Sequence, residues 1–313
     1  MSESPPVISR LELEQPATLA ALDLACRNWG VFYLTEHGLP DAEQLFAEAR
    51  RFFAGTAEDK NTVRRTATNA WGFYDAELTK NTRDWKETFD FGPAVGTFRA
   101  QWPAYQPALR HVAEQHYAAC EVLSYELLSA ISANLGVGGS FLFHAFEPDH
   151  SSFVRLNHYP ECPEPSAPSG PEVPAQGYLG VNHHTDAGAL TLLLTDGVPG
   201  LEVYVQDVWR EIPPLDGALI INLGDVLQVW SNDRYRAPLH RVRSQTRQPR
   251  MSVPFFFNPK DSFDYAPLGT PDAARYHPIN FGEFRRLRAL GDYVDRGEEV
   301  QIEHFRDHSG GVE

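Results

Sequence analysis

The sequence predicts a mainly β protein with flanking helices, whose core is an all-β sandwich or jelly roll formed by the second half of the chain. From residue 151 onward, short runs rich in β-branched and aromatic residues follow one another at close spacing. Turn signals such as "DG" at 196–197 and 216–217 separate these runs. Three longer segments with helical spacing lie upstream, so we expect helices packed against the β core.

The first part of the chain is predicted to mix helices with a strand. Residues 30–38, "GVFYLTEHG", are bounded by glycines and rich in β-branched and aromatic residues, which favours a strand. We expect Pro40 at the first position of a helix and Gly136 at the end of the longest helix, where a glycine cap is common. The segments with helical spacing are 16–29, 40–55 and 104–136.

The second half contains a series of strand-like runs, interrupted once and followed by a final helical segment. Residues 161–177 hold five prolines and no periodicity, which predicts a surface loop. Residues 280–306 are expected to be helical at their start. The strand-like runs are 151–160, 178–184, 189–195, 201–206, 209–212, 218–224, 226–231, 239–245 and 250–259.

The composition disfavours several classes of partner and site. A formal net charge of −15 repels phosphate backbones, so we expect no nucleic acid and no membrane as a partner. No apolar run reaches the roughly 18 residues that a membrane helix requires, and the first residues lack the pattern of a secretion signal. The three cysteines are far apart without a CxxC pair, which argues against disulfides and thiolate zinc and favours the cytoplasm. A monomer is the default expectation.

Two histidines and an aspartate stand together in an otherwise apolar run, "GVNHHTDAGALTLLLTD". On a strand, His184 and Asp186 point to the same face, while His183 points to the other face. The pair is either a hydrogen-bonded His–Asp contact or part of a metal site, because polar groups in an apolar run must be satisfied. His240, in a later strand-like run, is a candidate third ligand. Two imidazoles and one carboxylate form the facial triad of non-haem Fe(II) oxygenases, which leaves positions for a bidentate co-substrate and O₂.

Two further pairs of polar residues share strand faces. Arg250 and Ser252 are two positions apart, and a guanidinium directed inward needs an anion, either a ligand carboxylate or a buried acidic side chain. Their strand follows His240 after a short connection, so we expect the two runs to lie close, as in a hairpin. Asn157 and Tyr159 also share a face and could bind a ligand carboxylate or carbonyl, or form the polar rim of a sheet.

Taken together, these motifs resemble, over nearly the whole chain, the isopenicillin N synthase-like branch of the 2-oxoglutarate- and Fe(II)-dependent dioxygenases. The N-terminal segment 25–40 is similar to the cap region of that branch, and "RDWKETFDFG", 83–92, is similar to its middle helix region. The other motifs, in chain order, are "RLNHYPECP" (155–163), "HTDAGALTLLL" (184–194), "NLGDVLQVWSN" (222–232), "HRV" (240–242) and "RMSVPFFFNP" (250–259).

The resemblance implies a fold, cofactors and residue roles. The fold is a distorted double-stranded β-helix with an N-terminal α/β cap, residues 1–100, on an oxygenase domain, residues 101–313, in one compact unit. The cofactors are Fe(II), 2-oxoglutarate as co-substrate, and O₂. By position, the implied Fe(II) ligands are His184, Asp186 and His240. The residues implied to bind 2-oxoglutarate are Arg250 and Ser252 at its distal carboxylate, with Asn157 and Tyr159 near the metal.

The function implied is oxidation of a small-molecule metabolite, by hydroxylation, desaturation or cyclisation, with succinate and CO₂ as co-products. One alternative within the same branch is an oxidase that uses O₂ without 2-oxoglutarate, in which Arg250 would hold the carboxylate of the substrate itself. A second alternative is a ligand-binding module without catalysis on the same fold. A third is a structural protein whose histidines and aspartate are core groups. The sequence leaves the substrate open.

Overall fold

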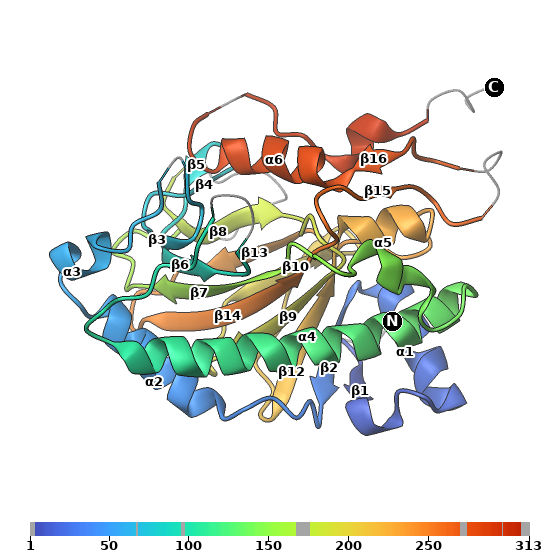
Figure 1. Cartoon of the computed structure of the whole chain (residues 1–313), viewed down its shortest axis with the longest axis horizontal. Coiled ribbons are helices and arrows are strands. Elements are labelled where there is room, and N and C mark those ends of the chain that lie inside the picture. Colours follow the sequence, from blue (N-terminus) through green and yellow to red (C-terminus); the bar gives the residue numbers. More distant parts are fainter. Residues whose placement is uncertain are drawn as a thin grey trace.

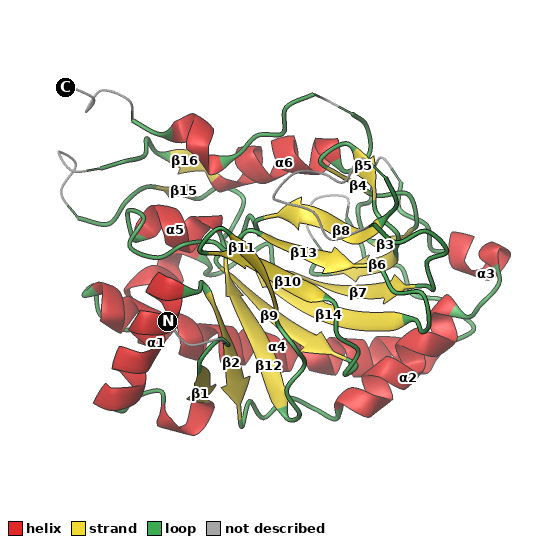
Figure 2. Ribbon diagram, turned by 180° about the vertical axis from the view of Figure 1, so that it is seen from behind, coloured by secondary structure: helices red, strands yellow, loops and turns green. Residues whose placement is uncertain are grey.

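Two β-sheets face each other at the centre of the molecule, and helices cover them from outside (Figure 1). The computed structural model describes residues 4–66, 68–94, 98–166, 176–269, 274–295 and 297–307. Seen from behind, the strands of both sheets fan out between α6 (Phe281–Gly291) on one side and three helices on the other (Figure 2). These three are α1 (Pro16–Asn28), α2 (Ala42–Phe53) and α4 (Pro107–Leu135). The predicted class, mainly β with flanking helices, is confirmed.

The larger sheet combines strands from both ends of the chain. Its neighbours pair antiparallel, except for the first two strands, which run parallel. In sheet order the strands are β1 (Val7–Ser9), β2 (Val31–Thr35), β12 (Ala218–Leu223), β9 (Leu190–Thr195), β14 (Arg250–Phe257), β7 (Phe153–Tyr159), β6 (Glu87–Phe91) and β3 (Gly72–Tyr74). Because β2 and β6 pair with β12 and β7, the N-terminal part of the chain is built into the core sheet.

The smaller sheet faces the middle of the larger one. Its strands, in sheet order, are β11 (Val208–Glu211), β10 (Leu201–Val205), β13 (His240–Arg243) and β8 (Leu179–His184). Apolar side chains from both sheets pack into one cluster between them, including Val181, Val203 and Val242 from the smaller sheet and Leu193 and Ile220 from the larger. Two short hairpin-like pairs complete the strands, β4 (Leu78–Thr79) with β5 (Thr82–Arg83) and β15 (Asp264–Tyr265) with β16 (Ile279–Asn280).

Helices α1, α2 and α4 pack against each other and against strands of the larger sheet, whereas α5 (Asp225–Trp230) contacts β15 and α6 contacts β16. The long α4 packs on β14 and β9 and ends at Gly136, which has the left-handed conformation expected of a C-cap, with φ 78°. The helices are α1 (Pro16–Asn28), α2 (Ala42–Phe53), α3 (Ala57–Asn61), α4 (Pro107–Leu135), α5 (Asp225–Trp230) and α6 (Phe281–Gly291), with shorter 3₁₀ turns η1 (Arg10–Glu12), η2 (Phe141–Ala145) and η4 (Ile302–Phe305).

Eight of the nine runs predicted as strands after residue 150 contain strands, and the exception is 226–231. These residues lie in α5, where Val226, Leu227, Val229 and Trp230 are all buried. That spacing, with buried positions one, three and four residues apart, is helical and does not alternate as a strand would. The prediction for Pro40 is also wrong, because Asp41 caps α2 by accepting a hydrogen bond from the Glu43 N–H, so Pro40 precedes the helix.

The segment 83–92, which the resemblance placed in a helical region, contains the end of β5 and all of β6 instead. Its polar residues Asp84, Lys86, Thr88 and Asp90 occur at every second position, which is the period of a strand. In the structure Thr88 and Asp90 pair with residues of β7. The mistaken prediction therefore came from the family comparison and not from the local pattern.

Two other expectations concern segments away from the core. Of the proline-rich segment 161–177, residues 167–175 lie outside the described residues, and Pro165 on its near side bridges to Tyr178. All three cysteines, Cys26, Cys120 and Cys162, are buried and unpaired. In the described ranges, none of the helices combines the length and apolar character needed to cross a membrane.

Candidate active site

The three predicted ligand side chains lie together at the ends of neighbouring strands. His184 ends β8, His240 begins β13, and the two residues are register partners in the smaller sheet. Asp186 follows β8 by two residues, and its Oδ1 lies 3.8 Å from His184 Nε2 and 3.7 Å from His240 Nε2. One candidate ligand atom from each residue falls within 4.8 Å of the others.

Hydrogen bonds hold these side chains with the ligand atoms directed at one another. The Nδ1 of His184 is 2.8 Å from the Asn182 carbonyl, and the Nδ1 of His240 is 3.0 Å from the Pro238 carbonyl. Each backbone oxygen can only accept, so Nδ1 donates and Nε2 keeps its lone pair. Thr191 Oγ1 donates to Asp186 Oδ2 at 2.6 Å, which leaves Oδ1 toward the imidazoles.

The donor set fits a divalent iron. Burial, together with the nearby His240, lowers the pKa of His184 well below its ordinary value, so the imidazole is neutral, as a metal ligand must be. Two imidazole nitrogens and one carboxylate oxygen match the composition of the facial triad. His183 takes no part, since it lines a separate groove together with Lys80 and Tyr204.

An inner chamber of about 70 Å³ opens beside the triad. Both remaining predicted pairs line it, because β14 and β7 are neighbours in the larger sheet and turn these positions toward the smaller sheet. All seven residues singled out from the sequence therefore meet in one place. They are Asn157, Tyr159, His184, Asp186, His240, Arg250 and Ser252.

Arg250 is a buried cation without a carboxylate partner among the described residues. The residue is 1% exposed, its Nε donates to the Val198 carbonyl at 3.1 Å, and its Nη1 has no hydrogen-bond partner in the described ranges. The guanidinium carbon lies 5.0 Å from the centre of the Tyr159 ring. Nearby, Asn157 donates to Ser252 Oγ at 3.4 Å, and its own Oδ1 has no partner within the part of the chain that is described. A buried guanidinium without a carboxylate partner is costly, and an anionic ligand would compensate its charge.

The expectation that His240 and Arg250 face each other across a hairpin is wrong. β13 belongs to the smaller sheet and β14 to the larger one, so the connection between them crosses from sheet to sheet. The two side chains nevertheless line the same inner chamber, because the sheets face each other. Short sequence separation correctly indicated proximity but not the topology.

An outer chamber of about 220 Å³ meets the inner one at the triad. Arg285, Arg288 and Tyr293, from α6 and the residues that follow it, line this chamber, as does Trp71 from the N-terminal part of the chain. The residues that line both chambers are Lys86, Arg155, Val181, His184, Asp186 and Phe256. A molecule in the outer chamber can therefore reach His184 and Asp186, whereas Arg250 lines the inner chamber.

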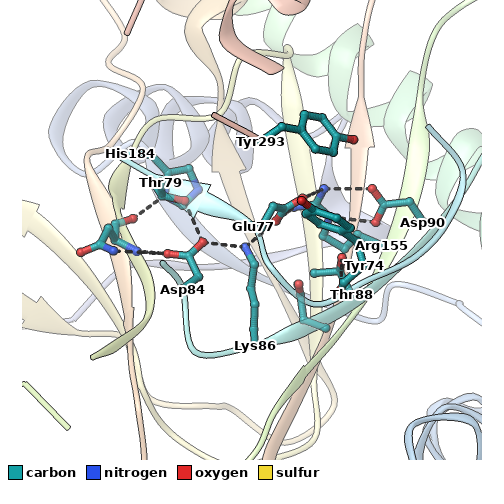
Figure 3. Close-up of polar contacts among 12 residues, drawn as sticks. Tyr74, Glu77, Thr79, Asp84, Lys86, Thr88, Asp90, Arg155, His184 and Tyr293 are labelled. Atoms are coloured by element: carbon teal, nitrogen blue, oxygen red, sulfur yellow. Dashed lines mark hydrogen bonds and ion pairs between the residues drawn. The ribbon is translucent and has the colours of Figure 1, made fainter. Parts of the chain in front are cut away.

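A buried ion cluster forms part of the wall of the outer chamber, and sequence reasoning missed it. Glu77 carboxylate oxygens lie 3.0 Å from Arg65, 2.9 Å from Lys86 and 2.8 Å from Arg155. In Figure 3, Lys86 extends between Glu77 and Asp84 on the side of the cluster nearer His184. We use "buried ion cluster" for Arg65, Glu77, Asp84, Lys86, Asp90 and Arg155. The alternation of polar residues over 84–90 was the one sequence pattern that pointed to this cluster.

Arg288 on α6 holds the backbone segment that carries two of the triad residues. It donates to the Thr185 carbonyl at 2.8 Å and to Asp225 Oδ2 at 2.6 Å. The Asp225 N–H in turn donates to the Asp186 carbonyl at 2.8 Å. Groups that orient ligands in this way affect metal binding although they do not touch the metal.

We therefore expect Arg288→Gln to weaken Fe(II) or Co(II) binding by about tenfold, the lower end of the effect of outer-shell partners. Anaerobic titration calorimetry with Co(II) measures this directly. Arg286→Gln, an exposed arginine on the same helix, is the matched control and should bind Co(II) as the parent does. Equal Co(II) affinity in the parent and in folded Arg288→Gln protein would contradict a positioning role for Arg288.

Comparison with known proteins gives this arrangement a family. Residues 150–259 match the model of the 2OG-Fe(II) oxygenase superfamily, and residues 6–109 match that of the non-haem dioxygenase in morphine synthesis N-terminal region. Gibberellin 20 oxidase 2 from Oryza sativa subsp. japonica is 32% identical over 272 residues, which is 83% of this chain and 67% of the relative. The chain belongs to the 2-oxoglutarate/Fe(II) oxygenase superfamily.

Further relatives agree in sequence and in fold. Jasmonate-induced oxygenase 4 from Arabidopsis thaliana is 30% identical to this oxygenase over 291 residues, covering 87% of the chain and 78% of the relative. The crystal structure of JOX2 in complex with 2OG, Fe and JA superposes with a TM-score of 0.79 at 27% identity, covering 96% of this chain and 88% of that one. The two facing sheets are accordingly the double-stranded β-helix core of the superfamily. The oxygenase is a non-haem, Fe(II)- and 2-oxoglutarate-dependent dioxygenase.

Proposed function

We propose that the protein oxidises a C–H bond of a small-molecule metabolite bound in the outer chamber, with 2-oxoglutarate in the inner chamber. The observation that carries this assignment is the unpaired Nη1 of buried Arg250, in a chamber that opens onto the His–Asp–His triad. A dicarboxylic keto acid supplies both an anion for the guanidinium and a chelating end for the metal. The relatives named for gibberellin and jasmonate support a small-molecule substrate.

In this proposal His184, Asp186 and His240 hold Fe(II). When bound, Fe(II) with 2-oxoglutarate and O₂ supplies the oxidising chemistry, and succinate and CO₂ are the co-products. The chain's own contribution at the metal is orientation, because backbone carbonyls fix both imidazoles and Thr191 fixes the carboxylate. The same hydrogen bonds keep the ligand atoms in place before the metal arrives, which lowers the ordering cost of binding.

Arg250 and Ser252 bind the distal carboxylate of 2-oxoglutarate, and Asn157 and Tyr159 border it nearer the metal. The planar guanidinium offers two parallel N–H donors, which match a carboxylate better than an ammonium would. The Tyr159 ring beside the guanidinium restricts its motion, so little side-chain freedom is lost on binding. The apolar side chains Leu193 and Val242 close the rest of the inner chamber and keep water from the buried charges.

The first test is an anaerobic titration of the Fe(II)-loaded protein with 2-oxoglutarate, followed by the weak visible charge-transfer band of the chelated keto acid. The parent protein should give a saturable band. Arg250→Ala should need at least about tenfold more 2-oxoglutarate to reach half-saturation, because a charge-assisted hydrogen bond to a carboxylate is lost. Arg250→Lys should fall between, since it keeps the charge but not the paired donors.

Arg247→Ala is the matched control for this titration, because Arg247 is exposed in the connection between β13 and β14. It should titrate as the parent does. Iron binding without any band in the parent would favour the oxidase alternative, in which Arg250 holds the carboxylate of the substrate and no succinate forms. A band of unchanged affinity in Arg250→Ala would remove the assigned role of Arg250.

Three further assignments belong to the same proposal. We infer that residues 1–100 act as a cap region and residues 101–313 as the oxygenase domain of one compact unit. The pairing of β2 and β6 with core strands supports a single unit. We also infer a cytoplasmic location, which the three buried, unpaired cysteines support, and action as a monomer.

The intact triad argues against a ligand-binding module without catalysis.

A further inference from the structure

Among the described residues that line the outer chamber, one cation has no carboxylate at hydrogen-bond distance. Five cationic side chains line it among the described residues: Arg65, Lys86, Arg155, Arg285 and Arg288. The first three belong to the buried ion cluster, where each has carboxylate oxygens within 3.0 Å. Arg288 has Asp225 at 2.6 Å. For Arg285 the nearest carboxylate is that of Asp261, at 3.7 Å and with a half-exposed side chain.

The contacts of Arg285 leave one side of its guanidinium available. Its Nη1 donates to the Ser151 carbonyl at 3.2 Å, and the distant Asp261 also faces Nη1. Neither Nε nor Nη2 has a partner in the part of the chain that the structure describes. These two nitrogens form the edge that binds a carboxylate through two parallel hydrogen bonds. Burial and the nearby Arg155 lower the pKa of Arg285, although Asp261, Asp90 and Asp292 act to raise it.

An aromatic wall runs from Arg285 toward the triad. The Arg285 guanidinium carbon lies 5.2 Å from the centre of the Phe153 ring. Phe153 stacks on Phe256 at 4.7 Å and lies 5.5 Å from Trp71, and all three rings line the outer chamber. Phe256 also lines the inner chamber beside His184. The three rings therefore form an apolar surface that extends from Arg285 to the triad.

We propose that the substrate is a small organic acid whose carboxylate binds the Nε–Nη2 edge of Arg285 and whose apolar body lies along Phe153 and Phe256 toward the triad. This inference rests on the proposed function, since the triad defines the end of the molecule that reacts. In this arrangement one arginine of each chamber binds a ligand carboxylate, Arg250 that of 2-oxoglutarate and Arg285 that of the substrate. Arg285 is a specificity-determining residue, because a neutral analogue leaves its charge unmatched.

The test uses three matched pairs of probes that differ only in charge: phenylacetate, benzoate and hexanoate, each against its primary amide. Ligand-observed NMR titrations are run without oxygen on the Fe(II)-loaded protein saturated with 2-oxoglutarate, so that the inner chamber is filled. We expect the preferred acid to bind at least about tenfold more tightly than its amide, as expected for a charge-assisted hydrogen bond. Arg285→Gln should abolish this preference, and Arg285→Lys should retain part of it.

Arg286→Gln is the matched control, because Arg286 is the next residue of α6 and is exposed. It should show the parent's preference for acids. The inference is overturned if acids and amides bind equally, if none of the acids binds, or if the preference survives in Arg285→Gln. Retention of the 2-oxoglutarate band in Arg285→Gln shows that the variant is folded and loaded.

The same titrations separate this inference from the proposed function. Arg250→Ala should keep the preference for acids, because it leaves the outer chamber unchanged. A parent protein that gives no 2-oxoglutarate band but still prefers the acids would refute the co-substrate assignment alone. A parent that gives the band but does not distinguish acids from amides would refute the substrate inference alone.

Discussion

Asp186→Ala is expected to abolish iron-dependent formation of succinate and to weaken Fe(II) binding by more than about a hundredfold, beyond the range of outer-shell changes. Asp186 supplies the only carboxylate among the three clustered ligand groups. Its removal leaves two neutral imidazoles and no negative charge to offset that of the metal. Anaerobic Fe(II) titration and a succinate assay measure the two effects separately.

Thr191→Val is the graded control for this variant. It removes the 2.6 Å hydrogen bond to Asp186 Oδ2 but leaves the carboxylate itself. We expect about tenfold weaker Fe(II) binding, as for other partners that orient a ligand. If Asp186→Ala bound Fe(II) as tightly as Thr191→Val does, Asp186 would not be a ligand.

Glu77→Gln is expected to lower the free energy of unfolding by about 3–5 kcal/mol, the cost of leaving a buried charge uncompensated. Glu77 contacts Arg65, Lys86 and Arg155, and its side chain is 4% exposed. The substitution leaves three cations with the two remaining carboxylates of the buried ion cluster. Equilibrium unfolding in urea, which does not change the ionic strength, measures the loss.

Glu114→Gln provides the comparison, since Glu114 forms an exposed pair with Arg110 on α4. An exposed pair of this spacing contributes only about 0.3–0.5 kcal/mol. Similar losses of stability in Glu114→Gln and Glu77→Gln would mean that the buried ion cluster is not a source of stability.

In the parent protein, acid should remove the stability that the ionised Glu77 carboxylate provides. Burial raises the pKa of Glu77, but Arg155, Lys86 and Arg65 outweigh it and hold the pKa well below its ordinary value of about 4.3. A carboxyl whose pKa is lowered by folding stabilises the protein above its unfolded pKa, and this stability is lost as the pH falls toward the folded pKa. Below about pH 4 the parent should therefore lose stability faster than Glu77→Gln.

Sequence reasoning worked where one strand carries both members of a pair. The two-residue period alone placed Arg250 with Ser252, and Asn157 with Tyr159, and both pairs line the inner chamber. It also assigned His183 to the other face from His184, as the structure has it. These predictions depend only on local geometry, which a strand enforces.

Contacts between elements that lie far apart in the chain could not be predicted from the sequence. Arg285 and Arg288 stand in an ordinary amphipathic helix, and nothing local indicates that α6 lies over the triad. Glu77 precedes a two-residue strand and gains its partners only through the fold. The alternation of polar residues indicates the strand 87–91, and there the local pattern is a better guide than the family resemblance.

The two halves of the inner chamber come from different sheets. The triad belongs to β8, β13 and the turn after β8, whereas Arg250, Ser252, Asn157 and Tyr159 belong to β14 and β7. Among the described residues the two sheets share no backbone ladder, and packed side chains fill the space between them. A molecule that binds the metal at one end and Arg250 at the other contacts both sheets and so links them. Without 2-oxoglutarate this link between the sheets is absent. We therefore expect the two sheets to move more freely relative to each other in the unloaded enzyme than in the loaded one.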